Sequence, residues 1–193
     1  MYEAKTFAHL LGTPGFSDAL LKNHFTLYEG YVKNTNALIE TLRSAKHAPG
    51  SPEYNELTRR FGWEWNGMRL HELYFGNMTS GGKALSDGTL KDAIEKTWGS
   101  YDAWQKDLVG CGTMRGIGWV VLSYDPEKNA LFNTWINEHD AGHLAGSVPL
   151  LVMDVFEHAF MIDYGLKRAD YIAAFLAAID WSVVEVRYTR AAS

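Results

Sequence analysis

The stretch Asp154-Val155-Phe156-Glu157-His158-Ala159-Phe160 contains the most informative pattern in this chain. An aspartate and a histidine four residues apart point the same way if the chain between them is helical or tightly turned, and both can then bind one metal ion. Taken alone, this pair is more typical of a core histidine beside a capping aspartate. Asp163-Tyr164 and residues 167–171 (Lys-Arg-Ala-Asp-Tyr) extend this stretch, and the longer pattern is needed to distinguish the two alternatives.

The composition outside this stretch limits the kinds of metal site that the chain can form. With 193 residues, 47% of them hydrophobic and 21% charged, the chain can bury one sizeable core or two small ones. Its single cysteine, Cys111, excludes an intramolecular disulfide and leaves too few thiolates for a zinc knuckle or an iron–sulfur cluster. Any metal ion is therefore expected to have nitrogen and oxygen ligands.

The N-terminal segment and the net charge indicate where the protein acts and what it does not bind. Residues 1–5 lack the basic start and apolar core of a signal peptide, and no uncharged apolar run approaches the roughly 18 residues of a membrane span. The formal net charge of −5 comes without the basic stripe of a nucleic-acid binder. We therefore expect a cytoplasmic protein that binds neither membranes nor nucleic acids.

Upstream of the quoted stretch, the chain begins with a helical pattern. A first helix is expected from Ser17 or Asp18 to about Ala45, because apolar and aromatic residues recur at helical spacing and residues 47–50 (His-Ala-Pro-Gly) then break it. Ser51-Pro52 predicts the capped start of a second helix, since proline is favoured at the first helical position. Two long helices joined by a short turn form an antiparallel hairpin.

The period changes after Thr79-Ser80-Gly81-Gly82, which predicts a helical hairpin domain at residues 1–82 and a mixed α/β domain at 83–193, with the metal site between them. The second region has helix patterns at Asp87 to Thr97, Tyr101 to Val109 and Ala169 to Val186, and strand patterns at Gly116 to Tyr124, Ala130 to Ile136 and Val148 to Val152. Gly99 and Gly110 are expected to end the first two helices in the left-handed conformation. The fold class is α+β.

The quoted stretch closely resembles the signature of the iron/manganese superoxide dismutases, which reads D-x-W/F-E-H-A followed by a tyrosine, basic residues and D-Y. Residues 31–36 match the family's Y-V-x-N-x-N, residues 71–75 match its H-x-L/F-F/Y-W/F, and residues 116–122 resemble its G-S-G-W-x-x-L strand. The matches keep their order over most of the chain. The resemblance implies a helical hairpin followed by an α/β region with a three-stranded antiparallel sheet, in agreement with the element pattern.

The same resemblance implies the metal ligands and the reaction. Carried over by motif, the ligands fall on His24, His71, Asp154 and His158, and they would hold one iron or manganese ion per subunit. The implied activity is the conversion of superoxide to dioxygen and hydrogen peroxide by one-electron cycling of that ion. Three imidazoles and one carboxylate suit several first-row metals, so the sequence leaves iron and manganese both open.

Two further residues near the metal follow from the resemblance. Some family members hold the metal-bound solvent with a histidine fifteen residues before the aspartate ligand, and His139 stands at that spacing, with His143 one turn away as the alternative. Tyr31 resembles the family's gateway tyrosine, which hands protons toward that solvent. It follows His24 by seven residues where most members have eight, so we expect an ordinary first helix without a π-bulge and a rebuilt access channel.

The resemblance also implies an assembly. Glu157 would reach across a two-fold axis to hydrogen-bond His158 of a second subunit, which predicts an isologous homodimer and leaves open whether dimers pair into a tetramer. Trp119 and Phe156 are expected in the apolar wall that keeps the site dry. Three other tryptophans are expected to be ordinary residues of the hydrophobic core: Trp63, Trp65 and Trp98.

Two alternative functions are compatible with the same residues. A family member with an altered first helix can keep the metal but lose efficient turnover, and then serve as a metal-binding or interaction protein. A zinc hydrolase can also use three histidines and an aspartate. The sequence offers no obvious general base for hydrolysis, which favours the dismutase.

Overall fold

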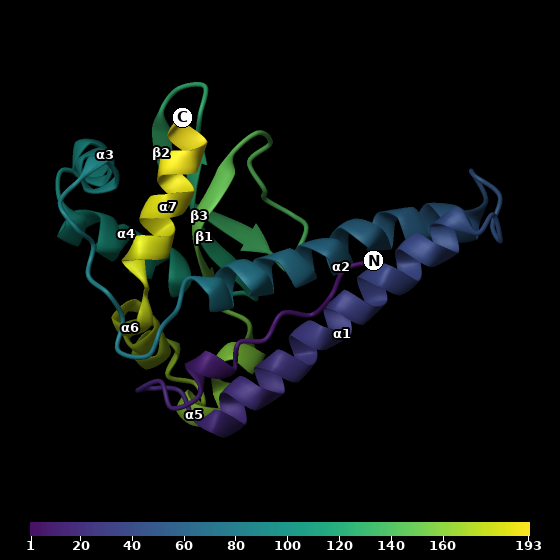
Figure 1. The fold of residues 1–193 in the computed structure, drawn as a ribbon, viewed down its shortest axis with the longest axis horizontal. Helices are drawn as coiled ribbons and strands as arrows, with labels where there is room; N and C mark the ends of the chain where they lie inside the picture. Colours follow the sequence, from purple (N-terminus) through teal and green to yellow (C-terminus); the bar gives the residue numbers. More distant parts are fainter.

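Two long helices form the N-terminal hairpin of the computed structural model, which describes all residues from 1 to 193 (Figure 1). Helix α1 spans Asp18–Arg43 and α2 spans Pro52–Gly76. The side chain of Ser17 accepts a hydrogen bond from a backbone N–H at the start of α1, and Ser51 does the same for α2, where Pro52 occupies the first position. The predicted hairpin is confirmed, and α1 ends two residues earlier than expected.

The first seventeen residues form an arm that lies along the hairpin (Figure 1). It contains one 3₁₀ turn, η1, at Ala8–Leu10. The amide side chain of Asn36 on α1 bonds both the N–H and the carbonyl of Tyr2, and the backbone N–H of Lys5 donates to the hydroxyl of Tyr28. The arm is thus fixed to the hairpin by side chains of α1.

A three-stranded antiparallel sheet forms the centre of the second region, as predicted. Strands β1 (Gly118–Asp125), β2 (Ala130–Asn137) and β3 (Val148–Asp154) lie in the order β2-β1-β3. In this register Trp119 at the start of β1 lies opposite Asp154 at the end of β3. Trp119 and the carboxylate of Asp154 therefore lie side by side at the end of the strands that faces the hairpin.

Helices α3 (Thr89–Trp98) and α4 (Tyr101–Gly112) precede the sheet and pack on it. Gly99 ends α3 with a φ of +85°, as expected. The expectation for Gly110 is wrong, because α4 continues to Gly112. A Cβ at Gly112 would lie 2.7 Å from the side chain of Met153, so the absence of a side chain there allows α4 to approach β3.

The C-terminal part contains more short elements than predicted. After β3 come the 3₁₀ turn η2 (Glu157–Ala159) and helices α5 (Met161–Tyr164), α6 (Arg168–Ala178) and α7 (Trp181–Ala192). The single helix expected from Ala169 to Val186 is wrong. Ile179 is extended and pairs with Met78, and the carboxylate of Asp180 caps α7 by accepting from the N–H of Ser182. The apolar periodicity continues across this break and so conceals it.

One continuous hydrophobic core joins the hairpin to the α/β region. Its largest fully buried side chains come from both parts of the chain: Tyr28 and Tyr74 from the hairpin, Trp104, Trp119 and Phe175 from the remainder. None of the helices is both long enough and apolar enough to cross a bilayer.

Candidate metal centre

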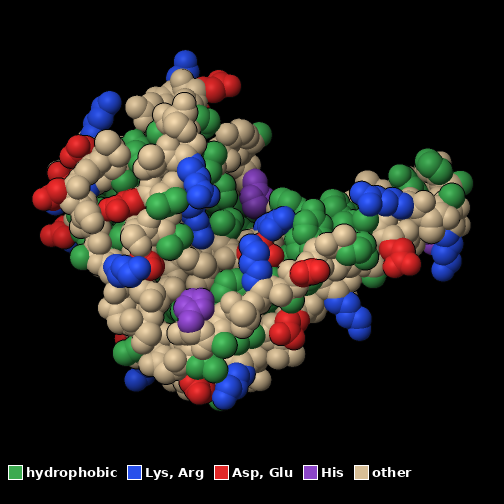
Figure 2. Space-filling model, viewed as in Figure 1, with side chains coloured by type: hydrophobic (Ala, Val, Ile, Leu, Met, Phe, Trp, Pro, Cys, Tyr) green, Lys and Arg blue, Asp and Glu red, His purple; other side chains and the backbone are tan.

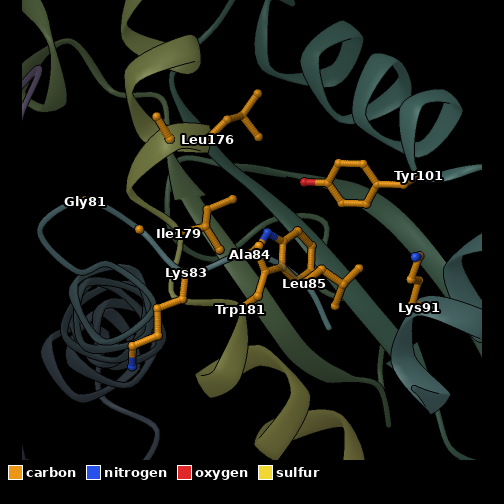
Figure 3. A pocket seen from close by; sticks show the side chains of 11 residues that line it. Gly81, Lys83, Ala84, Leu85, Lys91, Tyr101, Leu176, Ile179 and Trp181 are labelled. Carbon is orange, nitrogen blue, oxygen red and sulfur yellow. The ribbon is translucent and has the colours of Figure 1, made fainter. Parts of the chain in front are cut away.

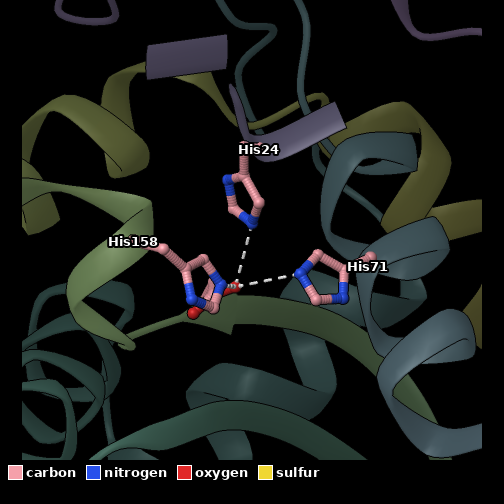
Figure 4. Close-up of side chains that lie close together, drawn as sticks. His24, His71 and His158 are labelled. Atoms are coloured by element: carbon pink, nitrogen blue, oxygen red, sulfur yellow. Dashed lines mark hydrogen bonds and ion pairs between the residues drawn. The ribbon is translucent and has the colours of Figure 1, made fainter. Parts of the chain in front are cut away.

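Four side chains from four separate elements converge at the junction between the hairpin and the sheet (Figure 4). His24 comes from α1, His71 from α2, Asp154 from the end of β3 and His158 from η2. One potential ligand atom of each lies within 4.8 Å of the others. The first three side chains are buried and His158 is 28% exposed, so the cluster lies just beneath the surface.

Asp154 is the centre of this cluster. Its Oδ2 lies 3.2 Å from Nε2 of His24, 3.2 Å from Nε2 of His158 and 3.7 Å from Nε2 of His71. Its Oδ1 accepts a hydrogen bond of 2.8 Å from the backbone N–H of Phe156, and its carbonyl accepts one from the hydroxyl of Tyr171. One carboxylate oxygen is therefore held by the backbone while the other faces three ring nitrogens.

The chain turns tightly between Asp154 and His158, which brings the two side chains together. Strand β3 ends at Asp154, and the next residues enter the 3₁₀ turn. The sequence allowed either a helix or a tight turn here, and the structure contains the turn.

His71 has a buried nitrogen that no group of the protein satisfies. Its Nδ1–H donates to the carbonyl of Gly67 at 2.6 Å, which fixes the tautomer and leaves a lone pair on Nε2. That Nε2 is buried without a hydrogen-bond partner and points at the carboxylate of Asp154. Buried polar atoms are nearly always paired, so an orphaned lone pair among two imidazoles and a carboxylate fits a metal ion. The donor set suits iron and manganese.

Burial and mutual contact shift the pKa values of these groups. Burial lowers the pKa of His24, partly offset by its hydrogen bond to Asp154, and burial together with the neighbouring His24 lowers the pKa of His71 still further. Burial alone would raise the pKa of Asp154, but the imidazoles of His158 and His24 outweigh it and lower that pKa. Two neutral imidazoles and an ionised carboxylate are the protonation states that metal ligands need.

Tyr31, His139 and Trp119 form a hydrogen-bonded chain beside the cluster. The hydroxyl of Tyr31 lies 2.8 Å from Nε2 of His139, and the indole N–H of Trp119 donates to Nδ1 of the same ring at 3.1 Å. Because Nδ1 accepts, the neutral imidazole carries its proton on Nε2 and donates it to Tyr31. Burial lowers the pKa of His139 to about 4, which keeps the ring neutral.

His143, the alternative to His139, lies elsewhere. It is exposed, and its Nε2 bonds the backbone carbonyl of His139 at 2.9 Å. The structure thus brings His139 beside the cluster and leaves His143 on the outer side of the same loop.

The separation of seven residues between His24 and Tyr31 is compatible with a regular α1 helix. The helix is continuous from Asp18 to Arg43 without a π-bulge, so a separation of seven residues puts His24 and Tyr31 on one face. The ring of Tyr31 stacks on His71 at a centroid distance of 5.1 Å. A Cβ at Gly67 would lie 2.6 Å from this ring, so the glycine provides the space that Tyr31 occupies.

The expectation that Trp63 is a plain core residue is wrong. Its ring lies 4.5 Å from that of His139 and 5.6 Å from that of Tyr31, and its indole N–H donates to the carboxylate of Glu138. A signal for this contact exists in the sequence, since Trp63, Gly67 and His71 are spaced by four residues on one face of α2.

The remaining walls of the site are aromatic. Phe156 stacks on His139 at 4.8 Å and on His158 at 5.0 Å, and Trp119 lies 4.9 Å from His71. The cluster and the Tyr31–His139 pair are therefore enclosed by rings that exclude bulk water.

A helical hairpin and a three-stranded α/β region that share three imidazoles and one carboxylate define the class of protein that could hold a single first-row transition-metal ion at their junction. Residues 86–187 match the model of the C-terminal domain of the iron/manganese superoxide dismutases. The chain is 38% identical to the iron superoxide dismutase of Cupriavidus metallidurans over 182 residues, covering 92% of this chain and 90% of the relative.

Other relatives carry either metal in their names. The chain is 35% identical to manganese superoxide dismutase 2 of Haloferax volcanii, covering 92% and 89% of the two chains. It is 36% identical to the iron superoxide dismutase of Aquifex pyrophilus, covering 92% and 86%. The chain belongs to the iron/manganese superoxide dismutase family.

Proposed function

We propose that the protein is a superoxide dismutase whose iron or manganese ion is held by His24, His71, Asp154 and His158. The observation that carries this proposal is the orphaned Nε2 of His71. It is buried, it has its lone pair free, and it faces the same carboxylate oxygen as the other two ring nitrogens. In a chain of this family, such a convergence supports a mononuclear metal site.

The bound ion would supply one-electron redox chemistry, so that two superoxide anions and two protons yield one dioxygen and one hydrogen peroxide. The protein residues bind the ion, exclude water and deliver protons. Gly67 fixes the ring of His71 through its carbonyl, and Phe156 N–H fixes the carboxylate of Asp154. Partners of this kind orient ligands and raise their affinity for metal.

Proton delivery is assigned to Tyr31 and His139. The hydroxyl of Tyr31 accepts from Nε2–H of His139, and its own proton is then free to point toward the cluster. Trp119 holds His139 in the tautomer that this arrangement requires. Burial raises the pKa of Tyr31, so the hydroxyl keeps its proton at neutral pH.

A homodimer with Glu157 at its interface is part of the proposal. Glu157 is exposed beside His158, and His158 makes its only side-chain hydrogen bond through Nε2. The other ring nitrogen is thus available to a carboxylate from a second copy. Two exposed apolar side chains, Met114 and Leu166, line the same surface hollow as Glu157. Exposed apolar groups of this kind mark interaction surfaces.

The proposal includes two coarser features. Residues 1–82 and 83–193 act as two domains that share the metal site, because each supplies two of the four ligands. A cytoplasmic location agrees with the single half-buried cysteine, Cys111, since unpaired thiols are typical of reducing compartments.

A superoxide-decay assay combined with elemental analysis tests the function. Protein purified from its native host is expected to contain close to one iron or manganese ion per chain and to accelerate superoxide decay in proportion to its metal content. Removal of the metal with a chelator should abolish the activity, and reloading should restore it. Full metal content without turnover would contradict the dismutase and favour a metal-binding role, and zinc as the native metal would favour a hydrolase.

A further inference from the structure

A second cleft lies between α2 and the sheet, away from the metal cluster. It has a volume of about 590 Å³ and is bounded by α2, by the strands, by the loop at 143–147 and by the N-terminal arm. None of the four cluster residues lines it. Figure 2 shows the hollow on the face toward the viewer, where the hairpin meets the rest of the molecule, with hydrophobic side chains inside and Lys or Arg side chains around it.

The floor of this cleft is apolar and its sides are cationic. Leu70, Leu73 and Val121 are among the apolar residues that line it. Lys5, Arg69 and Arg187 contribute three positive charges, and Glu72 is the one carboxylate among the lining residues. Glu72 already binds Lys5 at 3.0 Å and Arg69 at 2.6 Å. The cleft therefore has a surplus of two positive charges in a chain whose net charge is −5.

Arg187 is the cation that has no counter-ion. Its Nη1 donates to the carbonyl of Leu150 at 2.7 Å and to the side chain of Asn77 at 3.2 Å, and its Nη2 donates to the carbonyl of Leu73 at 3.1 Å. No carboxylate lies within ion-pair distance of it, and Nε makes no hydrogen bond. Burial lowers the pKa of Arg187 to about 10. A partly desolvated guanidinium with free N–H groups is a typical carboxylate site.

Another hollow of the molecule, beside Tyr101 and Trp181, lacks this property. It has a volume of about 430 Å³ and is lined by Tyr101, Trp181 and two lysines (Figure 3). Lys83 is paired with Asp180 at 2.7 Å, and Lys91 is paired with Asp87 at 2.6 Å. Because both of its cations are neutralised, that hollow offers no charge to an anionic ligand.

We propose that the cleft beside α2 binds a small carboxylate with an apolar body, such as a medium-chain fatty acid. The carboxylate would lie against Arg187, and the hydrocarbon would cover Leu70, Leu73 and Val121. Arg69 and Lys5 share the single carboxylate of Glu72, so they add a net positive charge to the same cleft. A cleft of this volume is within the range of small-molecule sites, in which an apolar lining is combined with a few fixed polar groups. An uncharged ligand would leave Arg187 without a counter-ion, whereas a carboxylate supplies one.

Calorimetric titration with octanoate tests the proposal, with octanol as the uncharged control. We expect one octanoate per chain and affinity for octanol that is weaker by about tenfold or more, because a hydrogen-bonded charge pair is lost. Arg69→Gln and Arg187→Lys should each weaken octanoate binding by about tenfold. Arg190→Gln, one turn along α7 from Arg187 and without a side-chain partner, is the matched control and should bind as the wild type does. Melting curves would show whether each variant is folded.

A blocking variant makes the test independent of charge. Ser147 lines the cleft, and its hydroxyl bonds only the carbonyl of Leu144 within its own turn, so Ser147→Trp should fill the mouth and abolish octanoate binding. Equal binding of octanol, or octanoate binding that survives both Ser147→Trp and Arg69→Gln, would overturn the proposal. A different result would also overturn it. If octanoate does not bind and the mass doubles with concentration in the wild type but not in Ser147→Trp, a second copy of the chain covers the cleft instead. None of these readouts depends on dismutase activity.

Discussion

The two regions of the molecule supply the four-residue cluster in different ways. The hairpin supplies His24 and His71 from the interiors of two continuous helices, whereas the C-terminal region supplies Asp154 and His158 from a strand end and a single 3₁₀ turn. On the helical side, regular backbone geometry fixes the two imidazoles, and the carbonyl that orients His71 belongs to its own helix. On the other side, tertiary contacts do so, through the hydroxyl of Tyr171 and the N–H of Phe156. Two side chains of the cluster are thus held by regular helices, and the other two are held by tertiary contacts.

This difference has a consequence for the metal. A helix holds a side chain in place with or without an ion, while a short turn depends on the contacts of its carboxylate. We therefore expect the metal to stabilise the segment from Asp154 to His158 more than the hairpin.

Replacement of one of the proposed metal ligands should have the largest effect on metal binding and activity. Replacing His71, Asp154 or His158 with alanine is expected to abolish metal retention and activity together, with metal affinity reduced by more than about 100-fold, since even outer partners of ligands cost 10- to 100-fold. Metal content measured after dialysis and the superoxide-decay rate would check this. Asp170→Ala, an exposed aspartate on α6, is the control. A variant that stayed fully metallated would show that the replaced residue is no ligand.

The next largest effect should come from the loop that carries His139. Loss of its ring leaves the four proposed ligands intact, so His139→Ala should retain metal but turn over superoxide about 10- to 100-fold more slowly. His143→Ala should remain close to wild type, because that ring bonds only a backbone carbonyl on the outer side of the loop. Metal analysis and turnover of both variants give the comparison. If His143→Ala is the slower variant, His143 holds the metal-bound solvent instead. If neither variant is slower, Tyr31 is the remaining proton donor.

Much of the fold followed from local signals in the sequence. Ser17 and the Ser51-Pro52 pair capped the two helices as expected, and the three strands were found close to where they were predicted. The pair Asp154 and His158 was a weak signal by itself, and it became a site prediction only because the residues around it resemble the family signature.

The errors arose where packing rather than local pattern decides. Asp180 caps a new helix inside a continuous apolar pattern, and α4 continues past Gly110 to Gly112, where the missing side chain leaves room for Met153. Trp63 was assigned to the core because the contact that reveals its position is with His139, which is 76 residues away in the sequence. The spacing of Trp63, Gly67 and His71 indicates the face of α2 on which Trp63 lies, but it does not show that His139 packs against that face.

A smaller effect is expected at the subunit contact. If Glu157 bonds the partner's imidazole, Glu157→Ala should weaken the dimer by about tenfold, the cost of one charge-assisted hydrogen bond. Metal affinity should fall with it, because the carboxylate would orient a ligand. Sedimentation at low protein concentration measures the first effect and metal analysis the second. Glu127→Ala, in the turn between β1 and β2, is the matched control. An unchanged dimer with unchanged metal content would contradict the bridge.

The smallest effect concerns acid sensitivity, and it isolates a histidine of the C-terminal region from those of the hairpin. Burial lowers the pKa of His139 from 6.5 to about 4, so between these values the unfolded chain binds a proton that the folded chain does not. Stability therefore falls as the pH falls.

From about pH 7 to about pH 5.5, this one ring should reduce the free energy of unfolding of the metal-free protein by about 1 kcal/mol. His139→Gln keeps an acceptor for the indole N–H of Trp119 but has no proton to bind, while the buried His24 and His71 remain in both proteins and their contributions cancel. Urea unfolding of the two metal-free proteins at both pH values should show the wild type losing about 1 kcal/mol more than the variant. Parallel losses in the two proteins would mean that His139 is protonated in the folded state, and Trp119 could not then donate to Nδ1.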